Sequence, residues 1–402
     1  MIQNKRIDAF NDTSIKVPFI LPQITKDDLR AIKQAFDSPL LTDGPKLCEF
    51  ENKFIKFTKS KFAIGVSNAT SALQLSLKTL GIGEKDEVII PDMTFVATGN
   101  VVLAVNATPV LADVDLDDMN ISIESIKKNI TSKTKAIIPV HFAGKACKID
   151  KILKIGREYG LKIIEDCAHA IGTFYKGKHV GNYGDCGCFS FYPTKNFTTI
   201  EGGMIITNNK TIADYTRILR NHGISKTLKE RFHRGKPWDY DVNEAGFNYR
   251  LDEIRASLGI SQLKRVKKMN LLRRKAALYY DHHLKNIKGI ITPSVTDDYS
   301  AHLYVIRIQD EYVQKRDQVF NKLLEKGIRT SVHYKPLHEF TVFRKKAKIY
   351  DKLDNSKQAY KEIISLPLYP KILRMEQDKV IEQLVVPRHK ALIRERSGTI
   401  QL

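Results

Sequence analysis

Short runs of apolar, mostly β-branched residues alternate with stretches of helical periodicity between about residue 62 and residue 209. Several runs are nearly continuous in apolar residues, as in strands covered on both faces. The runs predict strands at "FAIGVS", "EVIIPD", "PVLADVD", "AIIPVH", "KIIEDC", "GCFSFYP" and "GGMIITNN". Helices are predicted between several of them, at "TSALQLSLKTLG", "VATGNVVLAVN", "SIESIKKNI" and "DKILKIGREYG". Strands that alternate with helices are joined by right-handed crossovers, so this region predicts an α/β fold with a mostly parallel sheet.

The pattern changes on both sides of this region. Before it lie a predicted helix, "KDDLRAIKQAF", and a turn-rich "LLTDGP". After it, residues 248–285 have the periodicity of one long helix or a broken one. The remaining chain predicts a smaller α+β unit from "HLYVIRI" (strand), "KRDQVFNKLLEKG" (helix), "IRTSVHY" (strand-like) and a helix after "SLPLYP". We therefore predict a large domain over residues 1–255, including an N-terminal arm, and a small C-terminal domain over residues 256–402.

The composition is typical of a soluble globular protein, with 42% apolar and 28% charged residues in 402. No apolar run is long enough to cross a bilayer. The N-terminal "MIQNKRIDAFNDTS" lacks the apolar core of a secretory signal. We therefore expect a cytoplasmic protein without a membrane partner.

The formal net charge of +21 raises the question of a nucleic-acid partner. The lysines are scattered, however, and the clustered segment "KRVKKMNLLRRK" has helical periodicity, which favours a solvated helix face. Nucleic-acid modules carry a fold signature as well as charge, so we expect no nucleic-acid partner. An anionic small-molecule substrate is a second explanation of the charge and stays open.

The five cysteines do not form a predicted disulfide framework, because their number is odd and no secretion signal precedes them. Four residues suggest a zinc site at first sight: Cys167, His169, Cys186 and Cys188. Neither Cys-x-His nor Cys-x-Cys has the two-residue gap of structural zinc sites. Small buried side chains in strands explain these residues better, and we expect no metal.

Ligands bind outside the carboxyl ends of the strands in an open parallel sheet. The segments that follow predicted strands should therefore line one pocket: "SNATS", "PDMTF", "PVHFAG", "EDCAH" and "PTKN". In the first of these, free N–H groups around Ala69 and Thr70 at a helix start form either an anion site or a plain capped helix. The sequence contains no GxGxxG or Walker loop, so a dinucleotide or ATP has little support.

Three residues at predicted strand ends indicate a cofactor site when they are considered together, although each has a structural explanation alone. Alone, Asp166 in "IIEDCAHA" is explained by a structural ion pair, and Phe95 in "PDMTF" by a place in the core. Lys195 in "PTKN" adds an amine that can form a Schiff base. The acid can keep a pyridine nitrogen protonated, the aromatic ring can stack on a ring face, and the helix start can bind a phosphate. Together with the lysine amine, these groups are the ones needed to hold pyridoxal phosphate (PLP).

The chain resembles the DegT/DnrJ/EryC1/StrS aminotransferases, which make amino sugars. The motifs that carry the resemblance follow one another in the family's order: "LLTDGPKLCEFE", "GVSNATSALQL", "PDMTFVAT", "PVHFAGK", "IIEDCAHAIG", "GDCGCFSFYPTKNFTTIEGGMI", "NHGI", "GFNYRLDEIRASLG" and "SLPLYP". The resemblance implies the fold-type I PLP architecture, with a seven-stranded, mostly parallel sheet and a smaller C-terminal α+β domain. It also implies a homodimer with shared active sites.

The resemblance assigns roles in the cofactor site. Lys195 matches the Schiff-base lysine, and Asp166 matches the partner of the pyridine nitrogen. His169 matches the position, often Gln or His, that contacts the cofactor's phenolic oxygen, and Phe95 matches the stacking aromatic. The positions that match phosphate-binding residues are Ala69, Thr70 and Ser190.

Other positions are implied to act across subunits or on the substrate. Asn248 in "GFNYR" matches a residue that reaches the cofactor of the neighbouring subunit, and Arg250 is a candidate for the donor's carboxylate or the substrate's phosphates. Residues in "SVHYKPLHEF", namely His333, Tyr334 and His338, either line the substrate site or have a structural role. The loop 226–244 is expected to help select the substrate.

Two departures from the family pattern are mild. This chain has Ala69 where many members have glycine, and Ile200 where many begin a Gly-Glu-Gly-Gly segment. Some relatives replace the lysine with histidine and are dehydratases. This chain keeps Lys195, which favours transamination.

The implied reaction moves an amino group from L-glutamate to a keto-sugar, with a nucleotide-linked keto-deoxysugar as the expected acceptor. The first alternative is the same fold acting on a non-nucleotide keto sugar or an aminocyclitol precursor. A remote alternative is a non-catalytic basic regulatory or nucleic-acid-binding protein, which would bind DNA in a salt-sensitive way and carry no covalent cofactor.

Overall fold

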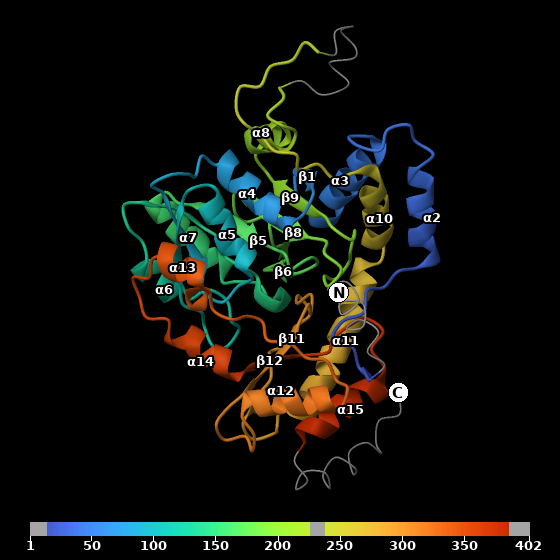
Figure 1. Ribbon diagram of the computed structural model, residues 1–402, viewed down its shortest axis with the longest axis vertical. Helices are drawn as coiled ribbons and strands as arrows, with labels where there is room; N and C mark the ends of the chain where they lie inside the picture. Colours follow the sequence, from blue (N-terminus) through green and yellow to red (C-terminus); the bar gives the residue numbers. More distant parts are fainter. Residues whose placement is uncertain (1–13, 226–237, 386–402) are drawn as a thin grey trace, which may run out of the picture.

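The computed structural model describes residues 14–225 and 238–385, and Figure 1 shows its arrangement. Residues 226–237 of the loop expected to help select the substrate lie outside the described residues. In the two described ranges, no helix has the length and apolar character needed to span a bilayer.

A seven-stranded sheet forms the centre of the large part of the molecule. In spatial order its strands are β1 (Phe62–Val66), β9 (Gly203–Thr207), β8 (Cys186–Ser190), β5 (Lys162–Asp166), β4 (Thr134–Ile137), β2 (Glu87–Pro91) and β3 (Thr108–Ala112). Only β9 runs antiparallel to its neighbours. The seven predicted strands are thus the seven strands of this sheet, and the predicted mostly parallel arrangement is confirmed.

Helices cover both faces of the sheet because successive strand residues point to opposite sides. Val88 and Ile90 of β2 belong to the core shared with α4 and α5, whereas Ile89 belongs to the core under α6 and α7. The helices of this part are α2 (Lys26–Ala35), α3 (Pro45–Thr58), α4 (Ala69–Thr79), α5 (Val96–Ala104), α6 (Ile123–Lys128), α7 (Ile149–Tyr159), α8 (Lys210–Arg220) and α10 (Glu253–Leu263). The four helices predicted between strands are α4, α5, α6 and α7.

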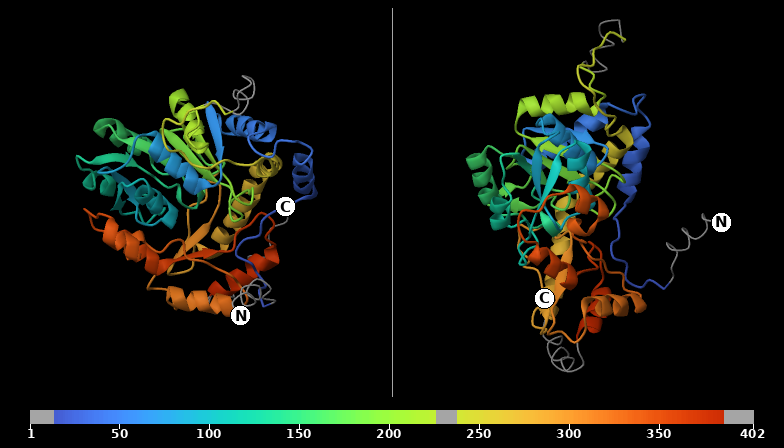
Figure 2. Two further views of the ribbon diagram at one scale, coloured as in Figure 1. Left: turned by 45° about the horizontal axis from the view of Figure 1, so that its top comes forward. Right: turned by 60° about the vertical axis from the view of Figure 1, so that its left-hand side comes forward.

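A smaller antiparallel sheet lies beside the large part, where Figures 1 and 2 show most of the orange and red C-terminal elements together. Its strands are β10 (Ile290–Ile291), β11 (Tyr304–Ile308) and β12 (Ile363–Leu366). The helices that pack with it are α11 (Val266–Leu284), α12 (Arg316–Glu325) and α15 (Arg374–Leu384). The predicted division of the chain after residue 255 stays a prediction.

Three local predictions differ from the structure. The helix predicted over residues 248–285, whole or broken, begins only at Glu253 and is broken at Lys264 and Arg265 into α10 and α11. The strand-like "IRTSVHY" forms no strand, because its ladder contacts are two isolated bridges, between Ile328 and Val17 and between Ser331 and Ser365. The sequence patterns also missed α3, α8, β10, β12, α13 (Thr341–Lys346) and α14 (Asp354–Glu362).

Residues 335–356, here called the return segment, run from the small sheet back onto the large one. Leu337 and Phe343 lie in the core of the large sheet, and Lys348 pairs with Val110 of β3. The buried Asp113 accepts hydrogen bonds from the backbone N–H groups at the start of α14, with a distance of 2.7 Å to the Ser356 nitrogen. The return segment is therefore fixed to the large sheet at several points.

A buried carboxylate links α10 to the start of α3. Glu253 accepts hydrogen bonds from the backbone nitrogens of Gly44, Lys46 and Leu47 at 3.1, 2.7 and 2.9 Å. These donors have no intrahelical acceptor at a helix start. A side chain far away in the sequence thus caps α3.

We expect Glu253→Ala to lower the free energy of unfolding by about 2 kcal/mol, because it leaves buried backbone donors without an acceptor. The matched control is Glu124→Ala on α6, whose side chain is 73% exposed and pairs with Lys127; it should change stability by less than about 0.5 kcal/mol. Urea unfolding followed by circular dichroism measures both. Equal midpoints for the two variants would contradict the capping role.

Candidate active site

Lys195 lies in the turn that follows β8, next to the strand that carries Asp166. Its backbone N–H donates to the Tyr192 carbonyl at 2.9 Å, which closes the turn. Burial disfavours the charged ammonium and lowers the pKa of Lys195 to about 8, although the nearby Asp166 acts in the opposite direction. The structure therefore supplies an amine that is partly neutral near physiological pH.

Asp166 is the buried last residue of β5. Its Oδ2 accepts a hydrogen bond from the Thr98 hydroxyl at 3.0 Å, and its Oδ1 accepts one from the Ala168 N–H at 3.1 Å. Across residues 14–225 and 238–385, no ion pair reaches this carboxylate. Burial raises the pKa of Asp166, although its two hydrogen bonds and the charge of the nearby Lys195 act in the opposite direction.

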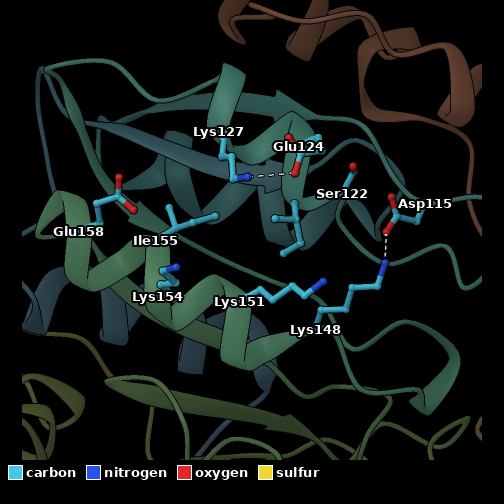
Figure 3. Close-up of a pocket in the computed structure, with 10 residues that line it drawn as sticks. Asp115, Ser122, Glu124, Lys127, Lys148, Lys151, Lys154, Ile155 and Glu158 are labelled. Carbon is cyan, nitrogen blue, oxygen red and sulfur yellow. Dashed lines mark hydrogen bonds and ion pairs between the residues drawn. The ribbon is translucent and has the colours of Figure 1, made fainter.

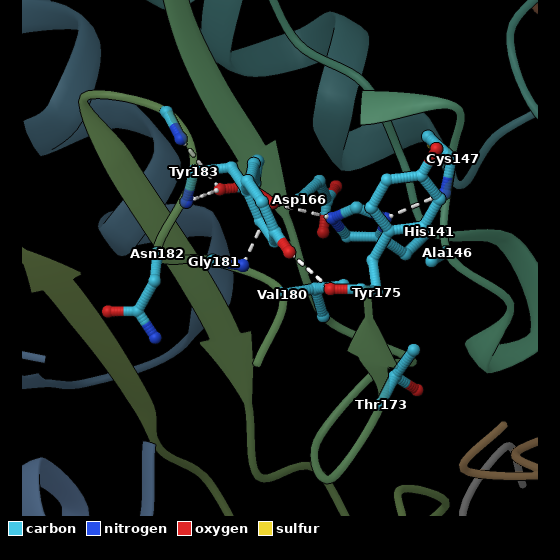
Figure 4. Close-up of polar contacts among 12 residues, drawn as sticks. His141, Ala146, Cys147, Asp166, Thr173, Tyr175, Val180, Gly181, Asn182 and Tyr183 are labelled. Carbon is cyan, nitrogen blue, oxygen red and sulfur yellow. Dashed lines mark hydrogen bonds and ion pairs between the residues drawn. The ribbon is translucent and has the colours of Figure 1, made fainter. Parts of the chain in front are cut away.

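A second buried carboxylate, Glu165, holds the end of β5 in place (Figure 4). It accepts hydrogen bonds from His141 Nε2 at 3.0 Å and from the backbone nitrogens of Gly181, Tyr183 and Gly184 at 2.8, 2.7 and 2.8 Å. Burial acts against ionisation here, but the hydrogen bond and charge of His141, with the backbone donors, lower the pKa of Glu165. This network fixes the strand whose next residue is Asp166.

Among the described residues, one group of histidine, cysteine and acidic side chains is close enough together to hold a metal ion, and it belongs to the Glu165 network. The ligand atoms of His141, Glu165 and Cys167 lie within 4.8 Å of one another. His141 Nδ1 already accepts a hydrogen bond from the Cys147 N–H at 3.1 Å, and Glu165 has the donors given above. These contacts explain the cluster as a packed hydrogen-bond network.

His169 lies between Asp166 and the small sheet. The distance between its Nε2 and the Tyr334 hydroxyl is 3.0 Å. Its Nδ1 is buried and has no hydrogen-bond partner among the described residues. Burial, and then the charge of Lys195, place the pKa of His169 well below its usual value, so the ring is neutral.

Two residues that the sequence patterns did not single out support this arrangement. The His302 ring lies 4.4 Å from the His169 ring, centroid to centroid, at an interplanar angle of 36°. The Asn196 amide nitrogen donates to Asn270 Oδ1 and to the Ser300 carbonyl, both at 2.8 Å, and its oxygen faces His302 Nδ1 at 3.0 Å. The sequence signal that could have identified Asn196 is its position directly after Lys195. No sequence signal identifies His302.

The start of α4 presents free backbone donors. The Asn68 side chain caps the helix by accepting from the Ser71 N–H at 2.8 Å. In the part of the chain that the structure describes, no acceptor within the protein binds the N–H groups of Ala69 and Thr70. Gly203 of β9 packs against this turn so closely that a Cβ on it would lie 2.5 Å from the Asn68 carbonyl carbon.

Ser190 reaches the same place from β8, where it pairs with Gly203. Phe95 is the N-cap residue of α5 and is 57% exposed, so it is not a core aromatic. Its ring centroid lies 6.0 Å from that of Tyr334. The structure thus gathers the predicted phosphate-binding and stacking positions at the same sheet edge as Lys195.

Asn248 and Arg250 lie at the margin of this edge. Asn248 is exposed and pairs through its backbone with Asn221. Arg250 lies beside the end of β1, and its guanidinium binds the Asn221 side-chain oxygen at 2.5 Å and faces Asp43 at 3.7 Å. Arg250 therefore has partners within its own chain.

The remaining predicted residues also have intramolecular partners. His333 Nδ1 lies 2.9 Å from the Ser365 hydroxyl, and burial lowers the pKa of His333 to about 4. His338 Nδ1 lies 2.7 Å from the buried Asp92 carboxylate, whose hydrogen bond raises the pKa of His338. A substrate-binding role for either histidine stays a prediction.

A separate hollow of about 620 Å³ lies between α6 and α7 and is lined by four lysines (Figure 3). Lys127 pairs with Glu124 at 3.0 Å, and Lys148 pairs with Asp115 at 2.7 Å. It contains none of the predicted site residues. Acidic neighbours thus offset much of its positive charge.

Comparisons with known proteins agree with this geometry. Residues 22–385 match the DegT/DnrJ/EryC1/StrS aminotransferase family. The chain belongs to this family. The spore coat polysaccharide biosynthesis protein SpsC of Bacillus subtilis is 38% identical over 372 residues, which cover 91% of this chain and 95% of that protein.

Two solved sugar aminotransferases have the same fold as this family member. PseC of Helicobacter pylori, an aminotransferase of pseudoaminic acid biosynthesis, has a TM-score of 0.84 at 30% identity and covers 92% of this chain and 98% of its own. The putative sugar aminotransferase Spr1654 of Streptococcus pneumoniae, in its pyridoxamine phosphate form, has a TM-score of 0.86 at 30% identity with the same coverage. The predicted family, fold-type I architecture and aminotransferase class are confirmed.

The site of this aminotransferase fits PLP in four respects. The buried Asp166 has no ion-pair partner in the described chain, and a protonated pyridine nitrogen would supply one. The unpartnered Nδ1 of His169 suits the phenolic oxygen. The free N–H groups of Ala69 and Thr70 at a helix start suit the phosphate. Lys195 is the amine that the aldehyde requires.

We expect Lys195 of the cofactor-free aminotransferase to react with an amine-selective acylating reagent with a midpoint near pH 8, because only the neutral amine reacts and its pKa is lowered to about 8. Exposed lysines should react with a midpoint near their usual pKa of about 10.4. In Asp166→Asn the midpoint should fall further, because the carboxylate favours the ammonium. Mass spectrometry of labelled peptides across pH measures this, and a midpoint equal to that of surface lysines would refute it.

Proposed function

We propose that this PLP-dependent aminotransferase moves an amino group from L-glutamate to the ketone of a nucleotide-linked keto-deoxysugar in amino-sugar biosynthesis. The observation that carries the proposal is the adjacency of the Lys195 amine and the buried Asp166 carboxylate at neighbouring strand ends. The relatives support the sugar: SpsC is named for polysaccharide biosynthesis and PseC for pseudoaminic acid biosynthesis.

Bound PLP supplies an electron-accepting ring that stabilises negative charge at the substrate carbon. Lys195 would hold the aldehyde of bound PLP, and its free amine would take up and return the proton at the donor's α-carbon. A pKa of about 8 suits this work because the amine can both accept and return a proton near neutral pH. Asp166 keeps the pyridine nitrogen protonated.

The surrounding residues hold and orient the cofactor. The N–H groups of Ala69 and Thr70, with the Ser190 hydroxyl, bind the phosphate. Phe95 stacks on the ring face, and neutral His169 contacts the phenolic oxygen. Because each group comes from a different strand end, small shifts of the sheet edge would disturb all of them.

The acceptor is the least constrained part of the proposal. A pyrophosphate-linked sugar suits a chain with a net charge of +21, because positive potential attracts such anions. A non-nucleotide keto sugar or a cyclitol precursor is the alternative acceptor. The non-catalytic nucleic-acid-binding alternative loses its support, because the chain belongs to an aminotransferase family.

A homodimer with shared active sites is part of the proposal. Asn248 is exposed in the single chain, as a residue that serves a neighbouring subunit should be. Large apolar side chains of the N-terminal region are also 44–60% exposed: Leu21, Ile24, Leu29, Phe36, Leu40 and Leu41. Such a concentration is typical of a surface that a partner covers.

We expect Lys195→Ala to lower glutamate-dependent amination at least about a thousandfold and to remove the visible absorbance of the lysine-linked cofactor. The control Lys154→Ala, in the hollow between α6 and α7, should change neither. The assay compares a nucleotide-linked keto-deoxysugar, the same sugar without its nucleotide, and a keto-cyclitol. Activity that survives in Lys195→Ala would refute the mechanism, and a preference for either smaller acceptor would favour the alternative substrates.

We expect an equimolar mixture of Lys195→Ala and Asn248→Ala, unfolded and refolded together, to recover up to about a quarter of wild-type activity. Half of the dimers would then be mixed, and one of their two sites would combine an intact Lys195 with an intact Asn248 from the other subunit. Each variant refolded alone is the control. Activity of the mixture equal to the mean of the two controls would show that Asn248 does not serve the neighbouring site.

A further inference from the structure

Tyr334 reaches into the cofactor site from the chain just before the return segment. Its hydroxyl lies 3.0 Å from Nε2 of His169, and this is its only hydrogen bond among the described residues. Its ring contacts those of Phe142 and Phe95, with centroids 6.4 and 6.0 Å away. The hydroxyl is therefore held in an apolar surrounding where His169 is its partner.

The direction of this hydrogen bond follows from the number of hydrogens available. A neutral imidazole carries one N–H and one bare nitrogen. If Tyr334 donates to Nε2, its hydroxyl hydrogen has an acceptor and the proton of His169 resides on Nδ1. If Nε2–H donates instead, the hydroxyl hydrogen of the half-buried Tyr334 has no acceptor among the described residues, which is less favourable. The first arrangement satisfies both groups.

The neighbouring groups keep both partners in the required protonation states. The titratable groups that act on His169 are Lys195 and His333, and they lower its pKa as burial does. The His302 ring lies against it at an angle and is itself neutral, because burial and the nearby His169 and Lys195 lower its pKa. Burial and Asp166 raise the pKa of Tyr334, so the phenol keeps its proton.

The unpartnered nitrogen of His169 then becomes a donor. Nδ1 is buried without a protein acceptor in the described ranges, and the phenolic oxygen of PLP is an acceptor of matching chemistry. We propose that Tyr334 is a positioning residue that fixes His169 as its Nδ1–H tautomer and so makes it a hydrogen-bond donor to the cofactor's phenolic oxygen. This inference rests on the proposed cofactor site and adds a role that lies outside it.

The fold holds Tyr334 in place from the large sheet. The Leu337 N–H donates to the Asp92 carbonyl at 2.8 Å, and the Asp92 carboxylate binds His338 at 2.7 Å. Asp92 directly follows β2, so Tyr334 is anchored to the same sheet edge as His169. The Tyr334 hydroxyl is thus held beside His169 by contacts with the large sheet. It can therefore select the His169 tautomer even if the small sheet does not move.

The test is the pH titration of the visible absorbance of the lysine-linked cofactor in Tyr334→Phe. Loss of the titrating proton leaves full negative charge on the phenolic oxygen, so a donor there favours the loss and lowers the midpoint. We expect Tyr334→Phe to raise the midpoint by about one pH unit, as for one hydrogen bond to a charged group. The matched control is Tyr312→Phe, which removes a buried hydroxyl bonded to the Leu384 carbonyl at 2.7 Å; it should leave the midpoint unchanged.

The same substitution in a His169→Gln background distinguishes positioning from direct contact. The glutamine amide donates through its nitrogen whatever its neighbour does, so Tyr334→Phe should cause no further shift there. An equal upward shift in both backgrounds, or no shift in the wild-type background, would overturn the proposal. A wild-type protein without the lysine-linked band would instead overturn the proposed function, and this inference with it.

A second measurement needs no substitution. Nitrogen-15 spectra of the histidine-labelled holoenzyme report which ring nitrogen carries the proton. The proposal requires His169 to be protonated at Nδ1 and bare at Nε2, with the resonance assigned by its disappearance in His169→Gln. The opposite tautomer would overturn it even if Tyr334→Phe failed to fold.

Discussion

A carboxylate buried without an ion-pair partner in the described chain is the constraint on which this site depends. Asp166 has two hydrogen-bond donors, Thr98 and the Ala168 N–H, but no ion pair within the described chain. Such a group is unfavourable unless a positive partner arrives, and a protonated pyridine nitrogen is that partner. The same burial that raises the pKa of Asp166 lowers that of Lys195, so one apolar environment prepares both groups for one cofactor.

The rest of the fold keeps this environment rigid. Glu165, one residue earlier, accepts hydrogen bonds from His141 and three backbone N–H groups. These bonds fix the end of β5. The return segment also binds Asp92 and Asp113, which directly follow β2 and β3. The small sheet is thereby tied to the sheet edge that carries the chemistry, and Tyr334 meets His169 as a result.

The sequence predicted the large sheet well because its strands are continuous apolar runs, and the rule for parallel sheets then located Asp166, Phe95 and Lys195 at one edge. It failed where structure depends on distant contacts. No glycine or proline shows where the helical stretch breaks at Lys264, and "IRTSVHY" forms only isolated bridges, one of them to Ser365 of β12. His302 could not be recognised, because its role arises only when the chain just before β11 packs against His169 and Asn196.

The most direct test of the account is a single-turnover experiment with the holoenzyme and L-glutamate in the absence of any keto-sugar. If Lys195 holds PLP and the donor half-reaction can run alone, about one equivalent of 2-oxoglutarate is released per site and release then stops. The visible absorbance of the lysine-linked cofactor should disappear at the same rate. No release, or release that continues without an acceptor, would contradict the account.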